Sequence, residues 1–241
     1  MKCKPLLPIA LGLCGAALRF FQCRTIFEPE TMLATPHSIS LLLPLFLALC
    51  ALLFAVTAGG KETNLSFSAA FRAPTSARLL GFNFSAFLLI PAGFYLVATH
   101  MGGSTLFLIF GALSAVAGAC LFLGILGWRR GRPSGTLLLI PVFFSLFWLF
   151  VTYQDYASWP VVEAYFVQVL AIAAIAYGFY QVAACAFSQG SRRALRFILP
   201  TAVVLCFTAL ADSTALPIRG MFLACLGALY GFYLSLNNEN K

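Results

Sequence analysis

Long charge-free apolar runs dominate this sequence and alternate with short segments that hold most of the basic residues. Because a bilayer core about 30 Å thick needs roughly 20 residues of helix, runs of this length predict membrane spans. We expect about eight such helices, arranged as successive antiparallel hairpins in an all-α, polytopic membrane bundle. Their approximate ranges are residues 5–23, 39–58, 79–100, 104–128, 135–154, 161–187, 195–212 and 217–236.

The first and seventh spans are less regular than the others. Their charge-free runs are short, so each helix must extend past an arginine, Arg19 or Arg196, whose long side chain can reach the lipid headgroups. Residues 1–20 also fit a signal peptide, and cleavage there would leave seven spans. An uncleaved first helix is favoured, because the chain continues through Arg19 and Gln22 without a clear processing site.

The basic residues set the orientation of the bundle. With the amino terminus inside, all of the 15 lysines and arginines except Arg19, Arg24 and Arg219 fall on the cytoplasmic side. Positive charge in short loops marks the cytoplasmic side of a membrane. We therefore expect both termini to be cytoplasmic, and the short connections favour a bacterial inner membrane.

Composition narrows the class of protein further. Hydrophobic residues make up 61% of the 241 residues and charged residues 9%, whereas a soluble domain carries about 25% charged residues. A soluble, secreted or nucleic-acid-binding protein is therefore excluded. We expect one transmembrane domain over residues 1–241 and no soluble domain, since the longest cytoplasmic connection runs only from Gly59 to Arg78.

The sequence lacks motifs for catalysis and for metal or cofactor binding. It has no His-Glu-x-x-His, no phosphate-binding glycine-lysine loop and no Gly-x-Ser-x-Gly elbow. Its two histidines and eight cysteines do not have the spacing of a zinc site. We therefore expect no cofactor and no metal, and an enzyme is the least favoured class.

The connection between the fifth and sixth expected helices combines tyrosines with two carboxylates, and a glutamine continues it into the next helix. Such a group suggests an outward-facing pocket for a cationic or amphipathic ligand, with rings for cation–π contact and carboxylates for charge. An interfacial aromatic belt is the alternative. The residues concerned are Tyr153, Asp155, Tyr156, Glu163 and Gln168.

Two further polar pairs lie on the outer side. Arg19 and Gln22 are three residues apart, so on a helix they share one face. They can receive an anion, or a carboxylate of Asp155 or Glu163 from a neighbouring helix; the alternative is that Arg19 reaches the interface alone. Asp212 and Arg219 flank the last connection, where we expect a structural ion pair.

A short sequence repeat suggests an internal duplication. Residues 177–180 and 230–233 both read Tyr-Gly-Phe-Tyr. Parallel duplication of the last two hairpins would explain this repeat. Chance recurrence in an apolar chain is the alternative.

Two functions fit these features. One is a small permease or transporter component with an outward-facing polar and aromatic pocket. The other is a non-catalytic membrane subunit or sensor module that acts through membrane lipid or another membrane protein. Small residues in the fourth expected helix suit close packing with such a partner. They are Gly111, Ala112, Ala115, Ala117, Gly118 and Ala119.

Overall fold

The computed structural model describes residues 5–25, 41–59, 64–101, 103–156, 165–212 and 214–237. Within these ranges all regular structure is helical, apart from two isolated β-bridges. The prediction of an all-α chain is therefore confirmed for the described residues. The helices are α1 (Leu7–Thr25), α2 (Leu42–Thr57), α3 (Phe67–Ala70), α4 (Ser76–Thr99), α5 (Thr105–Arg129), α6 (Gly135–Tyr156), α7 (Phe166–Ala186), α8 (Arg192–Ala209) and α9 (Leu216–Ser235).

Among the described helices, α4, α5, α6, α7 and α9 are long and apolar enough to cross a membrane. The remaining long helices differ from these five in length or charge. Helix α2 is apolar but has 16 residues, whereas α1 carries two arginines and α8 three; α4, α5 and α9 carry one each. The chain thus fits a multi-spanning membrane protein. The number of eight spans and the side of each terminus stay predictions.

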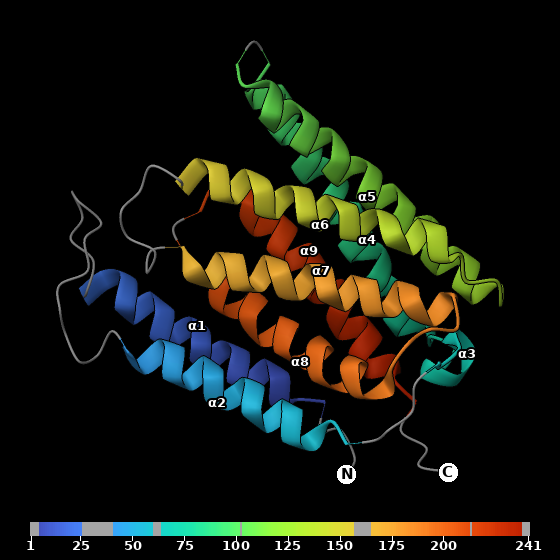
Figure 1. Cartoon of the computed structure of the whole chain (residues 1–241). Coiled ribbons are helices and arrows are strands. Elements are labelled where there is room, and N and C mark those ends of the chain that lie inside the picture. Colours follow the sequence, from blue (N-terminus) through green and yellow to red (C-terminus); the bar gives the residue numbers. More distant parts are fainter. Residues whose placement is uncertain are drawn as a thin grey trace.

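Six helices form a closed ring in chain order. Each helix from α4 to α9 packs against the next, and α9 packs in turn against α4. The hairpin of α1 and α2 lies beside this ring and packs against α8 (Figure 1). Helix α8 therefore connects the ring to the peripheral hairpin, mainly through its packing against α1.

Helices α4 and α5 approach each other backbone to backbone. A methyl group at Gly111 would lie 2.6 Å from the carbonyl oxygen of Gly93, and a methyl group at Gly118 would lie 2.8 Å from that of Ala86. Distances this short leave no room for a side chain. Glycine is therefore required where these two helices cross, as is common between membrane helices.

The small residues of α5 mostly serve this internal packing. Gly111, Ala117 and Gly118 are buried within the chain, whereas Ala112 and Ala119 are exposed. Three of the six small residues are therefore covered by the chain itself, and a partner on this helix stays a prediction.

Alanine at Gly111 is expected to lower the free energy of unfolding by about 1–3 kcal/mol, because the added methyl group forces α4 and α5 apart. Gly81 is the matched control, since nothing lies within 4 Å of a methyl group added to this α4 glycine. Alanine at Gly81 should stabilise the protein by about 0.5–1 kcal/mol through its higher helix propensity. Thermal unfolding in detergent measures both variants, and equal shifts of the same sign would contradict the close crossing.

The connection before α4 is tied to the ends of α7 and α9. The backbone N–H of Leu65 donates to the carbonyl of Gly190 at 2.8 Å, and that of Arg72 donates to the carbonyl of Ser235 at 2.8 Å. A segment that the sequence suggests is a polar loop is thus partly ordered against the ring, with the one-turn helix α3 at its centre.

Five aromatic side chains close this end of the six-helix ring. Trp128 at the end of α5 lies at the centre and contacts the four other rings at centroid distances of 5.3 to 6.0 Å. All five side chains are buried. We call the group the aromatic end cluster, and its members are Phe67, Phe71, Phe82, Trp128 and Phe232.

Candidate functional site

The buried face of α1 runs from small residues to polar ones. Its buried positions are Pro8, Gly12, Gly15, Arg19 and Gln22, separated by four, three, four and three residues, which places them on one helix face. A methyl group at Gly12 would contact Phe207 of α8, and one at Gly15 would contact Thr208. The glycines therefore bring α1 close to α8, and Arg19 is buried inside the protein.

Arg19 forms a buried ion pair with Asp212. Its Nε donates to Oδ1 of Asp212 at 2.5 Å, and the two side chains are 1% and 3% exposed. Asp212 lies in the connection that follows α8, 193 positions along the chain from Arg19. The pair thus joins the peripheral hairpin to the ring.

Three more side chains complete a polar cluster around this pair. Arg19 donates from Nη1 to Oε1 of Gln22 at 2.8 Å. Gln168 of α7 lies close to the Asp212 carboxylate and donates from Nε2 to the Tyr156 hydroxyl at 3.4 Å. We call these residues the polar cluster: Arg19, Gln22, Tyr156, Gln168 and Asp212.

The carboxylate of Asp212 is only partly satisfied. Its Oδ2 is buried and accepts no hydrogen bond from the described residues. The ring of Phe166 covers the other side of the pair, with the Arg19 Cζ 5.7 Å from the ring centroid. Arg19 therefore makes an ion pair, an amide contact and a cation–π contact, whereas Oδ2 of Asp212 has no hydrogen-bond donor among the described residues.

The expected ion pair between Asp212 and Arg219 takes a different form. Arg219 donates from Nη2 to the main-chain carbonyl of Asp212 at 3.0 Å, while the carboxylate pairs with Arg19. The Asp212 carboxylate is buried and faces into the bundle, whereas the Arg219 side chain is exposed, so Arg219 contacts the main-chain carbonyl of Asp212 instead. Arg219 still adds positive charge beside the carboxylate.

An apolar cavity lies next to the polar cluster. It has a volume of about 280 Å³ and lies between α1 and α2, where it is lined by Leu18, Phe21, Gln22, Leu42 and Leu43. Gln22 belongs to both the cavity wall and the polar cluster, so a molecule in the cavity is one side chain away from Arg19.

The other sequence-predicted site residues divide into two groups. Tyr156 belongs to the polar cluster and stacks on Tyr165, with ring centroids 4.8 Å apart. Tyr153 is 65% exposed, and Asp155 is exposed beside a separate hollow of about 210 Å³ that Phe107 also lines. Glu163 lies outside the described residues. A pocket built around Asp155 is therefore not part of the polar cluster.

The described residues contain no candidate metal site, because no three histidine, cysteine or carboxylate side chains lie together there. No known protein family, curated protein or solved structure matches the chain.

The polar cluster is expensive to bury. Taking two charges out of water costs several kcal/mol per ion, and well-packed apolar side chains would stabilise such a position about as well. Ionisable groups inside a membrane protein therefore mark sites of function more often than sites of stability. Among the described residues, the guanidinium groups of Arg19 and Arg219 both lie beside the Asp212 carboxylate, and this excess of positive charge at the carboxylate can attract an anion.

Proposed function

We propose that the chain is a small permease or transport component of a bacterial inner membrane, and that the polar cluster binds an amphipathic anion. The observation that carries this proposal is the buried Arg19–Asp212 pair, whose neighbour Gln22 lines an apolar cavity. The ligand differs in charge from the cationic molecule that the sequence favours, because the cluster carboxylate is already paired with a guanidinium.

An anionic head can replace Asp212 on Arg19. The guanidinium presents several N–H donors in a planar fork that suits carboxylates, sulfonates and phosphates. A ligand head would offer Arg19 the charge that Asp212 now supplies. The released Asp212 would remain near the positive charge of Arg219. Exchange of one anion for another keeps the buried charge balanced.

The cavity between α1 and α2 suits an aliphatic tail. Its volume of about 280 Å³ is nearly twice that of an apolar cavity of about 150 Å³ that holds benzene in another protein. Phe21 and Leu42 line it and are each about half exposed on the outer surface of the helices. A tail can therefore reach the cavity sideways from the lipid, with its head at Gln22.

The two ends of the bundle differ in a way that suits transport. The polar cluster lies at the end of the bundle where α1, α6 and α8 finish, and the aromatic end cluster closes the opposite end. A permease that works by alternating access holds one end closed while the other admits the ligand. This arrangement corresponds to a state that is closed at the predicted cytoplasmic end.

The alternative is a non-catalytic subunit or sensor module, and an exposed aromatic face on α4 favours it. Phe84, Phe94 and Tyr95 are each more than half exposed on this helix. A second membrane protein could cover them, although lipid would do so equally well.

Flux through proteoliposomes separates the two functions. Radiolabelled decanesulfonate and decyltrimethylammonium serve as probes with matched tails and opposite permanent charge. We expect saturable, protein-dependent uptake of the sulfonate alone. Arg19→Gln should abolish this uptake, whereas Arg24→Gln should retain it, because Arg24 lies on the same helix but is exposed.

The same flux experiment can contradict the permease proposal. If the folded wild-type protein moves neither probe, the permease proposal is wrong. Copurification of a membrane protein in stoichiometric amount would then support the subunit alternative.

A further inference from the structure

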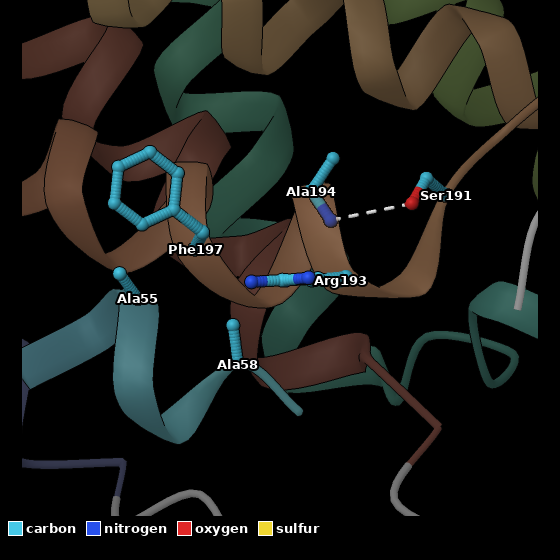
Figure 2. A pocket seen from close by; sticks show the side chains of 6 residues that line it. All are labelled: Ala55, Ala58, Ser191, Arg193, Ala194 and Phe197. Carbon is cyan, nitrogen blue, oxygen red and sulfur yellow. Dashed lines mark hydrogen bonds between the residues drawn. The ribbon is translucent and has the colours of Figure 1, made fainter. Parts of the chain in front are cut away.

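A second cavity lies at the other end of the bundle, between the end of α2 and the start of α8. Its volume is about 310 Å³, and it has apolar walls with two polar side chains at one side. Figure 2 shows the Arg193 guanidinium lying beneath the first turn of α8, toward Ala58, the residue that follows α2. The lining residues are Ala55, Ala58, Ser191, Arg193, Ala194 and Phe197.

Both polar side chains of this cavity can donate hydrogen bonds. Arg193 is exposed and makes no hydrogen bond or ion pair with the residues that the structure describes. The Ser191 hydroxyl accepts from the backbone N–H of Ala194 at 3.5 Å (Figure 2). Its own proton remains available to a ligand. The cavity thus offers a guanidinium and a hydroxyl to an acceptor-rich anion.

The charge that the described residues bring to this end of the bundle is positive. Asp155 and Asp212, the described carboxylates, both lie at the opposite end of the bundle. Arginines before and within the first turn of α4, at the end of α5, in the connection to α6 and in the first two turns of α8 gather at this end. They are Arg72, Arg78, Arg129, Arg130, Arg132, Arg192, Arg193 and Arg196. Such an end attracts the anionic lipids of a cytoplasmic leaflet.

The apolar part of the cavity continues onto a lipid-facing helix surface. Ala55 and Ala58 leave space on α2 beside the Phe197 ring. Leu52 and Val56 of the same helix are exposed next to this opening. A molecule held at Arg193 can therefore extend acyl chains along α2.

We propose that this cavity is a binding site for an anionic phospholipid. The phosphate lies against the Arg193 guanidinium and the Ser191 hydroxyl, the glycerol region fills the space beside Ala55, and the acyl chains follow α2. Basic pockets between membrane helices on the cytoplasmic side bind lipid headgroups in this manner. The site is independent of the polar cluster and of any transported ligand.

Thermal unfolding in detergent tests the site. Phosphatidylglycerol is titrated into the purified full chain, with phosphatidylcholine and inorganic phosphate as separate arms. We expect phosphatidylglycerol alone to raise the unfolding temperature, because a ligand that binds the native state stabilises it by mass action. A shift of equal size with inorganic phosphate would overturn the assignment to a lipid.

Matched variants distinguish lipid binding in the cavity from attraction of lipid by the positive surface charge. Arg193→Gln should weaken the apparent affinity for phosphatidylglycerol about fivefold. Ala55→Leu, which fills the cavity without changing charge, should weaken it as well. Arg130→Gln is the control, because Arg130 is also exposed at this end but lies outside the cavity. Equal losses for Arg193→Gln and Arg130→Gln, or full affinity in Ala55→Leu, would overturn the proposal.

Discussion

Replacing Asp212 by alanine is expected to lower the free energy of unfolding by about 3–5 kcal/mol, because the buried guanidinium of Arg19 then loses the carboxylate with which it pairs. The opposite change, Arg19→Met, should cost less, since a carboxyl group can become neutral by taking up a proton and a guanidinium cannot lose one. The double variant Arg19→Met with Asp212→Ala should be more stable than Asp212→Ala alone, because it no longer buries a guanidinium that has lost this carboxylate. Chemical unfolding in detergent, followed by circular dichroism, measures all three variants.

An exposed carboxylate provides the control for this series. Asp155→Ala should change the free energy of unfolding by less than about 0.5 kcal/mol, as expected at an exposed surface position. The ion pair would be refuted as a tie between α1 and the ring if Asp155→Ala and Asp212→Ala had equal effects. It would also be refuted if the loss of unfolding free energy in the double variant equalled the sum of the losses in the two single variants.

Replacing Trp128 by alanine is expected to lower the free energy of unfolding by about 3–5 kcal/mol, because the indole is buried and contacts the four other rings of the aromatic end cluster. Limited proteolysis should then cut the chain within residues 64–72, since Phe67 and Phe71 lose their main contact. The same unfolding measurement gives the loss of stability.

A lipid-facing ring separates cluster packing from the loss of any large side chain. Phe94→Ala removes a ring that is 62% exposed and should leave both the unfolding free energy and the proteolysis pattern nearly unchanged. Equal destabilisation by Trp128→Ala and Phe94→Ala would show that the aromatic end cluster does not close the bundle.

The all-α class could be predicted from the sequence, because long charge-free apolar runs are suited to the lipid core of a membrane, and a segment that crosses this core as part of such a bundle is a helix. The turn predicted between the third and fourth spans lies where α4 ends at Thr99 and α5 begins at Thr105. The uncertainty about the first and seventh spans also has a structural basis. Helices α1 and α8 each carry more than one arginine, and neither is among the five described helices that are long and apolar enough to cross a membrane.

The candidate site could be predicted only in part. That Arg19 and Gln22 share a face follows from their spacing, and both lie in the polar cluster. Asp212, the partner of Arg19, could not be predicted, because it comes from a connection 193 residues away. Burial of Arg19 did leave a signal, since Gly12 and Gly15 precede it on the same face and allow close contact with α8.

The segment before α4 shows another limit of sequence patterns. Its serines, threonines and charges suggest a polar connection, yet Phe67 and Phe71 are buried. A helix of four residues is too short to show periodicity. Only the pairing of this segment with α7 and α9 identifies it as part of the closed end.

Binding of decanesulfonate to the protein in nanodiscs tests the polar cluster as an anion site most directly. If the ligand head replaces Asp212 on Arg19, then Asp212→Asn removes a competing anion and should lower the dissociation constant about tenfold, whereas Arg19→Gln should abolish binding. Damage to the fold cannot produce tighter binding. An unchanged or weaker affinity in folded Asp212→Asn would contradict the claim that the buried pair is the ligand site.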